Sequence, residues 1–180
     1  MPSGCVLSAL DSSGKAQGDR FTAGVIKATL DKLVVYEGFD PGSFELLKQP
    51  GGKPYGTLNG QKVGVGIAHC NTLLVCALNR FGEIGIDVER RDRSLHPSLR
   101  KRIIHPDDEC GQTDEFCGIR LWTIKEAVLK YYGTGLRVAM NTIKLKVGGP
   151  YHYQAELETK TLAVTSFPFR DHWIAMVYRE

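Results

Sequence analysis

The sequence has no long apolar run, no Cys-x-x-Cys pair and no strong excess of one charge. Nothing approaches the roughly 20 apolar residues that a membrane-spanning helix needs, and the first residues lack a signal-peptide pattern. The five cysteines are an odd number without metal-ribbon or redox spacing, so we expect reduced thiols in a cytoplasmic protein. The 42% hydrophobic and 24% charged residues exclude a disordered chain, and 180 residues can bury a core.

Two kinds of hydrophobic periodicity follow one another along the chain, which predicts an α+β fold with antiparallel strands. Apolar residues at helical spacing predict long helices at 19–33 and 115–132, and a shorter helix from about Pro97. The Gly- and Pro-rich segment 38–60 predicts a long loop. Residues 79–82 are typical of a hairpin turn between two strands. The runs that predict strands are 62–68, 72–78, 83–88, 143–147, 151–157, 162–165 and 172–178.

Two carboxylates stand two residues apart at the end of an apolar run, in the pentapeptide 85–89. Alternation along a strand places Asp87 and Glu89 on one face, and Ile86 and Val88 on the other. Neighbouring carboxylates repel each other unless a cation lies between them, and Mg²⁺ prefers carboxylate and phosphate oxygens. A charged strand end that enters a turn explains the pair equally well. The pair alone therefore does not decide between a metal site and a solvated turn.

The predicted helix 115–132 adds a third acid. Trp122, Glu126 and Lys130 are spaced i, i+4 and i+8, so they form one stripe along the helix. Glu126 and Lys130 fit an exposed ion pair. They also fit a metal–phosphate site, which needs one more carboxylate and a cation for phosphate oxygens.

Four short elements occur together in an order that makes the pattern specific. They are Gly52-Lys53-Pro54, Ala68-His69, Gly85-Ile86-Asp87-Val88-Glu89 and Trp122-Thr123-x-Lys125-Glu126-Ala127-x-x-x-Lys130. The array resembles the 4′-phosphopantetheinyl transferases, especially the larger type that activates peptide and polyketide synthetases, here with a short N-terminal half. The resemblance is clearest over residues 53–136.

The resemblance implies a particular fold. The family has two similar halves related by a pseudo-twofold, each an antiparallel sheet with a long helix. The order of the motifs places an N-terminal half at 1–82 and a C-terminal half at 83–180. Because one chain then contains both halves, we expect a monomer.

The resemblance also implies a reaction. The family transfers the 4′-phosphopantetheine moiety of coenzyme A to a serine of an apo acyl or peptidyl carrier protein, and 3′,5′-ADP is released. By position in the motifs, Asp87, Glu89 and Glu126 would hold Mg²⁺, and Lys130 would stabilise charge on the pyrophosphate. Such carriers serve fatty acid, polyketide and nonribosomal peptide biosynthesis.

Further residues take roles from the same resemblance. Lys53, His69, Lys125 and, by a looser match, Arg20 would bind coenzyme A. A carboxylate must also accept the proton of the carrier serine. The candidates for that base are Glu126 and Asp108.

The chain is strongly basic directly after the acidic pair. Residues 90–102 hold six basic side chains and one acid, Asp92, and the basic residues are Arg90, Arg91, Arg93, Arg100, Lys101 and Arg102. Such a segment indicates a solvated face or an acidic partner. Because the family's carriers are acidic and dock beside the corresponding strand end, we expect the carrier to bind through the Arg90, Arg91 and Arg93 region.

Two other functions remain open. A Mg²⁺-dependent phosphohydrolase would use the same carboxylates with water in place of serine. A module that binds coenzyme A, RNA or an acidic protein without turnover would use the basic segment, but it leaves Asp87, Glu89, Glu126 and Lys130 unexplained. We therefore expect the transferase, with neither a membrane nor nucleic acid as its partner.

Overall fold

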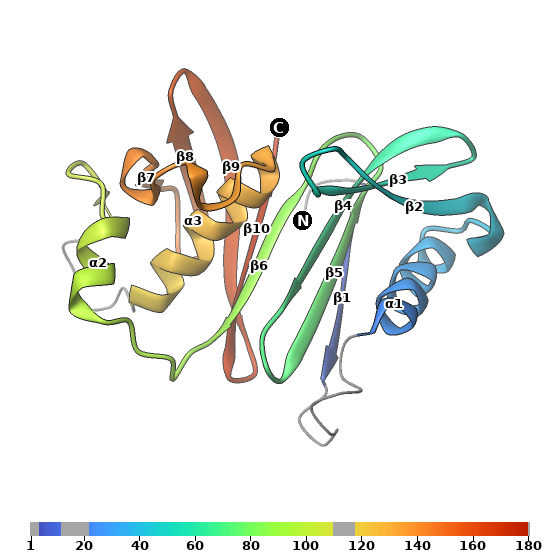
Figure 1. Ribbon diagram of the computed structural model, residues 1–180, viewed down its shortest axis with the longest axis horizontal. Helices are drawn as coiled ribbons and strands as arrows, with labels where there is room; N and C mark the ends of the chain where they lie inside the picture. The colour runs from blue at the N-terminus through green and yellow to red at the C-terminus, as the bar shows by residue number, and fades with distance from the viewer. Residues whose placement is uncertain (1–3, 12–21, 110–117, 180) are drawn as a thin grey trace.

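The computed structural model describes residues 4–11, 22–109 and 118–179. Two five-stranded antiparallel sheets lie in the middle of the molecule, and a long helix covers the outer face of each (Figure 1). No helix in the described segments is both long and apolar enough to cross a membrane. The order of layers is therefore helix, sheet, sheet, helix.

The first sheet and its helix come from the N-terminal part of the chain. Their elements are β1 (Cys5–Asp11), α1 (Ala23–Tyr36), the 3-10 turn η2 (Pro41–Ser43), β2 (Phe44–Lys48), β3 (Pro54–Leu58), β4 (Gln61–His69) and β5 (Leu73–Asn79). Helix α1 begins after Thr22, whose hydroxyl accepts a hydrogen bond from Val25 N at 3.4 Å and so caps the helix.

The second sheet follows with its own helix. Its elements are β6 (Gly85–Arg90), α2 (Pro97–Ile103), α3 (Gly118–Tyr132), η4 (Gly135–Arg137), η5 (Met140–Thr142), β7 (Lys144–Val147), β8 (His152–Leu157), β9 (Lys160–Phe169) and β10 (His172–Tyr178). The predicted helices from Pro97 and within 115–132 are confirmed over their described residues, and each strand predicted in the C-terminal part is present.

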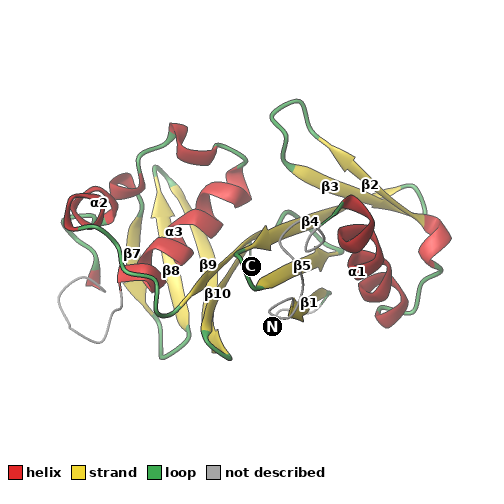
Figure 2. Ribbon diagram, turned by 60° about the horizontal axis from the view of Figure 1, so that its bottom comes forward, coloured by secondary structure: helices red, strands yellow, loops and turns green. Residues whose placement is uncertain are grey.

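The two sheets repeat one topology. Their strand orders are β1-β5-β4-β3-β2 and β6-β10-β9-β8-β7, so the same path is followed twice with five strands each time. In each sheet the long helix lies in sequence between the first and second strands (Figure 2). This confirms the α+β fold with two similar halves. The division at residue 82 stays a prediction, because β5 ends at Asn79 and β6 begins at Gly85.

Two predictions from local sequence were wrong. The expected loop 38–60 contains η2, β2 and β3. These strands form because they bury side chains such as Phe44 and Leu58 in the core under α1. The turn at 79–82 does not close a hairpin. Strand β5 pairs with β1 and β4, which occupy both of its edges, so β6 pairs with β10 in the other sheet. The turn therefore joins the two sheets.

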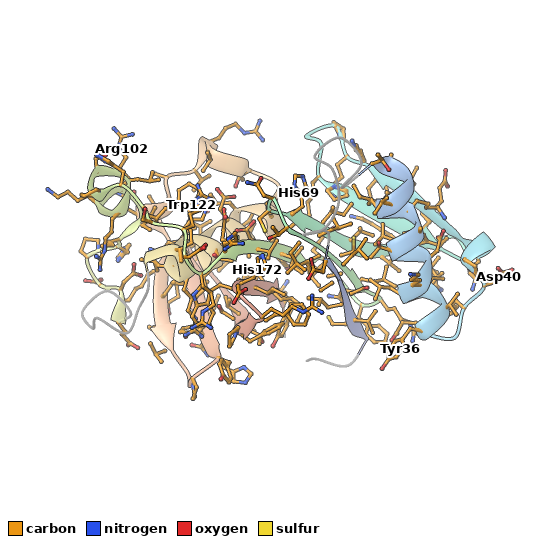
Figure 3. The ribbon with its side chains drawn as sticks, turned by 90° about the horizontal axis from the view of Figure 1, so that it is seen from below. Tyr36, Asp40, His69, Arg102, Trp122 and His172 are labelled. Carbon is orange, nitrogen blue, oxygen red and sulfur yellow. The ribbon has the colours of Figure 1, made fainter. Side chains whose placement is uncertain are left out.

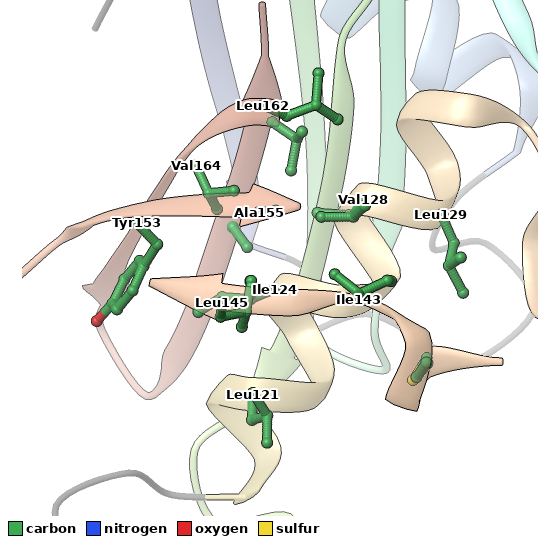
Figure 4. Close-up of a cluster of buried hydrophobic side chains, with 14 of the residues drawn as sticks. Leu121, Ile124, Val128, Leu129, Ile143, Leu145, Tyr153, Ala155, Leu162 and Val164 are labelled. Atoms are coloured by element: carbon green, nitrogen blue, oxygen red, sulfur yellow. The ribbon is translucent and has the colours of Figure 1, made fainter. Parts of the chain in front are cut away.

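Apolar side chains fill the space between all four layers. Helix α3 packs on the second sheet through the predicted stripe of Leu121, Ile124 and Val128, which meets Tyr153 and Val164 (Figure 4). A separate cluster joins α1 to the first sheet. The inner faces of the two sheets pack on each other through a third cluster, which includes Val75, Ala77, Ile86, Val88, Ile174 and Met176. Burial of these side chains is the main force that fixes the halves against each other.

Polar contacts also cross between the halves. At one end of the junction, Lys53 Nζ lies 2.5 Å from Glu83 Oε2. At the other end, Thr72 Oγ1 lies 2.8 Å from His172 Nε2. These contacts join the two halves through polar as well as apolar side chains.

Candidate active site

The acidic pair is positioned by an unusually close contact between β6 and α3. A Cβ atom on Gly85 would lie 2.1 Å from the carbonyl oxygen of Ala127, so only glycine permits this approach. Ile86 and Val88 point into the core between the sheets, as the alternation predicts. Asp87 faces α3, where Lys130 Nζ donates a hydrogen bond to its Oδ1 atom at 2.6 Å.

Asp87 is buried but only half satisfied. The residue is 6% exposed, and its second carboxylate oxygen, Oδ2, is buried without a hydrogen-bond partner. Burial raises the pKa of Asp87 to about 7, and the charges of Glu89 and Glu126 add to that rise while Lys130 opposes it. A buried polar atom without a partner costs about 1–3 kcal/mol. The carboxylate is therefore ready for a further cation or hydrogen-bond donor.

Glu126 and Glu89 complete the acidic cluster, which we define as Asp87, Glu89 and Glu126. Burial raises the pKa of Glu126, as does the charge of Glu89, whereas Lys130 and Arg93 lower it. Glu89 is held by Arg93, whose Nη1 atom donates to Glu89 Oε1. Lys130 pairs with Asp87 rather than with Glu126, so the exposed helical ion pair considered from the sequence does not form.

The oxygen ligands of this cluster fit Mg²⁺ in kind. The partnerless Asp87 Oδ2 atom is the observation that favours a cation there. As the side chains lie, no three His, Cys, Asp or Glu residues of the described segments converge closely enough to hold a metal. Two of the three carboxylates instead bind basic side chains of the protein. Lys130 donates to Asp87, and Arg93 donates to Glu89.

Residues of the N-terminal half line two pockets near the acidic pair. His69 ends β4 and lines the same surface depression as Glu89 and Arg93, near the middle of the molecule in Figure 3. A second pocket lies along the junction and is lined by residues 52–54, 65–67 and 84–86, and by Lys130. The structure thus places His69 and Glu89 in one depression and Lys130 in another pocket between the halves, where Lys130 bonds to Asp87.

Lys53 belongs to the pocket along the junction. Its side chain is 8% exposed, and its ammonium group bonds to Glu83 and to the carbonyl oxygen of Tyr131. It is therefore a link between the halves as well as a residue that lines the pocket. Arg20, the remaining predicted coenzyme ligand of the N-terminal half, lies outside the described residues.

A model of the 4′-phosphopantetheinyl transferase superfamily matches residues 83–177, more than half of the chain. The chain belongs to this superfamily. It is 34% identical over 131 residues to the 4′-phosphopantetheinyl transferase HetI of Nostoc sp. strain PCC 7120, an alignment that covers 65% of this chain and 53% of HetI. It is 29% identical over 131 residues to a 4′-phosphopantetheinyl transferase of Bacillus subtilis, covering 67% of this chain and 55% of the relative. The chain thus matches about half the length of each relative.

Lys125 was expected to bind coenzyme A, but it is buried elsewhere in the structure. Lys125 is 0% exposed, and its Nζ atom donates to Asp108 Oδ2 at 2.6 Å and to two carbonyl oxygens, of Ile103 at 2.6 Å and of Ile143 at 2.8 Å. It lies on the core side of α3, away from the side that carries Lys130. The expectation that Lys125 contacts coenzyme A is therefore corrected: this lysine joins α3 to the end of α2 and to the start of β7.

Asp108 is corrected for the same reason. Its Oδ1 atom accepts from Leu145 N and its Oδ2 atom from His105 N, both at 2.8 Å, in addition to Lys125. The next residue, Glu109, accepts from Val147 N at 2.9 Å. Leu145 and Val147 belong to the edge strand β7, so the two acids satisfy donors that another strand would otherwise bind. A fully buried and fully bonded Asp108 cannot accept the proton of a carrier serine.

The basic segment divides into two parts. Arg90 pairs with Asp92, and Arg91 lies over the ring of Trp173, 5.1 Å from its centroid. The basic residues of α2 are exposed, and Figure 3 shows Arg102 at the outer end of the C-terminal half: Arg100, Lys101 and Arg102. The contact of Arg93 with the acidic cluster was not foreseen. The i, i+4 spacing of Glu89 and Arg93 was the available signal.

Proposed function

We propose that this protein transfers the 4′-phosphopantetheine moiety of coenzyme A to a serine hydroxyl of an apo acyl or peptidyl carrier protein. The observation that carries the proposal is the buried Asp87 carboxylate. It has Lys130 on one oxygen and no partner on the other, in the motif that defines the resemblance. Membership in the superfamily and similarity to two 4′-phosphopantetheinyl transferases support the same reaction.

Asp87, Glu89 and Glu126 would hold the Mg²⁺ ion. When bound, the ion would supply positive charge to the pyrophosphate oxygens of coenzyme A. Burial raises the pKa of Asp87 to about 7, and the charges of Glu89 and Glu126 add to that rise, so a bound cation would offset the cost of ionising this carboxylate. The oxygen-only donor set supports Mg²⁺ over softer metals.

Lys130 and His69 would orient the coenzyme. Lys130 lines the pocket along the junction beside Asp87, where it can stabilise negative charge on a pyrophosphate. His69, from the other half, lines the depression that holds Glu89. We extend the role of coenzyme ligand to Lys53, which lines the same pocket as Lys130, and to Arg20.

In the reaction the serine oxygen forms a new bond to the phosphorus next to the pantetheine arm. The bond from that phosphorus to 3′,5′-ADP breaks, and the ADP phosphate keeps the electron pair. The serine proton passes to Glu126, the remaining candidate base, whose pKa burial raises. Transfers of this kind depend mostly on in-line positioning and on charge stabilisation.

The acidic carrier would dock on the basic segment. Arg90 and Arg91 lie beside the strand end that carries the acidic cluster, and the exposed cations of α2 continue the surface. Because one chain supplies both halves, the proposal includes a cytoplasmic monomer with halves at 1–82 and 83–180.

Intact-protein mass spectrometry tests the reaction. Several apo carrier proteins are incubated with coenzyme A, Mg²⁺ and the protein, and a Ser→Ala carrier at the modified serine is the control. A phosphopantetheine mass increase on the serine, with one 3′,5′-ADP per modified carrier, is expected. Release of 3′,5′-ADP without a carrier would indicate the phosphohydrolase. Binding of coenzyme A with no product would indicate a binding module.

A further inference from the structure

An arginine lies on the acidic cluster. Arg93 donates to Glu89, and its guanidinium group lies over the ring of Trp122, 5.8 Å from the centroid. Burial raises the pKa of Glu126, and the charge of Arg93 is among those that oppose this rise. Arg93 therefore binds Glu89 from the loop after β6, and its charge also acts on Glu126.

Two basic side chains thus bind different members of the acidic cluster. Lys130 engages Asp87 and Arg93 engages Glu89. The partnerless Asp87 Oδ2 atom is left on the buried side. This division explains why the acids of the described segments do not converge on a common point although their charges interact.

We propose that Arg93 is an internal substitute for the divalent cation, and that binding of the cation displaces Arg93 from Glu89 and from Trp122. The proposal rests on the proposed function, because it requires a cation at Asp87, Glu89 and Glu126. It gives Arg93 a positioning role. Arg93 keeps Glu89 in place before the metal binds, and it lowers the affinity for the metal by competing for the same oxygen.

The exposure of the two partners suits this exchange. The side chain of Arg93 is 45% exposed, whereas that of Glu89 is 15% exposed. An ion pair in which the arginine is half hydrated is weak, so a divalent cation can replace it. Lys130 differs, because its partner Asp87 has a side chain only 8% exposed and stays enclosed.

Neighbouring arginines provide matched controls. Arg91 lies two residues before Arg93 but contacts Trp173, and Arg90 pairs with Asp92. Substituting Arg91 removes the same charge from the same loop without removing the hydrogen bond from Arg93 to Glu89. A lysine at position 93 keeps the charge and tests whether the competition depends on it.

The test is the affinity for Mn²⁺ alone, measured by the loss of the free-ion electron paramagnetic resonance signal. We expect Arg93→Gln to bind Mn²⁺ about two- to fivefold more tightly than the wild type. Arg93→Lys and Arg91→Gln should bind it like the wild type. Unchanged or weaker binding in Arg93→Gln would overturn the proposal, as would an equal gain in Arg91→Gln.

Asp87→Asn separates this proposal from the one on which it rests. Loss of Mn²⁺ binding in Asp87→Asn with no gain in Arg93→Gln would overturn the role of Arg93 alone. Binding in Asp87→Asn equal to the wild type would overturn the metal site itself, and both proposals with it.

Tryptophan fluorescence gives a second readout that is independent of affinity. The chain has two tryptophans, and Arg93 contacts only Trp122 among them. Saturating Mn²⁺ should change the emission of the wild type as Arg93 leaves the ring, and Mg²⁺ should do the same without paramagnetic quenching. Under Mg²⁺ the Arg93→Gln protein should show no such change. An equal change in both proteins would contradict displacement.

Discussion

Helix α3 carries two lysines, five positions apart, that face two different aspartates. Lys125 is fully buried with Asp108, and every polar atom of that pair has a partner: three acceptors surround the ammonium group, and two backbone N–H groups also bind the carboxylate. Lys130 is 38% exposed and has one partner, Asp87, whose second oxygen has none.

The difference separates a structural pair from a reactive one. A closed network in a low-dielectric interior fixes the elements that it joins, since any opening leaves a buried charge. The Lys125–Asp108 pair holds the end of α2 and the start of β7 in this way. The Lys130–Asp87 pair leaves one buried carboxylate oxygen of Asp87 without a partner. A buried acid with a free oxygen can bind a metal ion or a substrate group.

We call Lys125–Asp108 the closed pair and Lys130–Asp87 the open pair. The largest expected effect comes from breaking the closed pair. Lys125→Met leaves the Asp108 carboxylate buried without its cation, so the free energy of unfolding should fall by about 3–5 kcal/mol. Lys130→Met should lower it by less, because Lys130 is partly exposed and Asp87, whose pKa burial raises to about 7, can take up a proton. Urea denaturation measures both variants. The double variant Lys125→Met/Asp108→Asn should recover part of the loss, and equal losses in the two lysine variants would contradict the comparison.

The next effect concerns activity at the open pair. Asp87→Asn should lower turnover by at least about 10²-fold, a loss of about 2.7 kcal/mol, because it removes the central acid of the cluster. Lys130→Met should lower kcat while the melting temperature stays near that of the wild type. Steady-state kinetics with a saturating carrier measures both. Near-normal activity that resists EDTA would return Asp87 and Lys130 to a purely structural role.

The sequence predicted where the residues around Asp87 and Lys130 lie, although it did not predict that these two side chains pair. Alternation along β6 gave the common face of Asp87 and Glu89, and helical spacing gave the side of α3 that carries Glu126 and Lys130. These are local rules that need no knowledge of distant contacts. The strands β2 and β3 were missed because each is only five residues long and the glycines and prolines around them obscure the alternation.

The closed pair depends on contacts that no local rule supplies. Lys125 lies four residues after Leu121 and four before Leu129, which places it on the apolar side of α3. A lysine there predicts burial only if a partner is known, and Asp108 lies 17 positions away. The motif therefore suggested a coenzyme ligand. The same limitation applies to the turn 79–82, whose residues cannot say which strand β6 will pair with.

A third prediction uses pH to expose the unmet charge of Asp87. Its pKa rises from 3.8 to about 7 on folding, chiefly through burial, so the folded protein binds more protons between those values. The contribution of Asp87 to the stability of the metal-free protein should therefore fall as pH rises from about 4 through 7. Relative to Asp87→Asn in EDTA, the wild type should lose stability up to about pH 8, and the loss should vanish below pH 4. Thermal unfolding across this range measures it, and a pH-independent difference would argue against the raised pKa.

The smallest expected effect lies on α2, which the closed pair fastens to α3. Lys101→Glu with Arg102→Glu should raise KM for an acidic carrier several-fold and leave KM for coenzyme A unchanged, because exposed charges act mainly on association. Added salt should weaken the wild type more than the variant, since such charges are screened beyond roughly 8 Å at physiological salt. A parallel rise in KM for coenzyme A would place these cations in the coenzyme site instead.

The central claim is that a divalent cation binds the free carboxylate oxygen of Asp87, and the most direct test locates that cation. Crystals grown with Mn²⁺ and coenzyme A should give an anomalous peak about 2 Å from Asp87 Oδ2, the atom that lacks a partner, with Glu89 and Glu126 beside it. The Lys125–Asp108 pair should be unchanged in the same crystals. A peak elsewhere, or none at Asp87 with coenzyme A bound, would contradict the account.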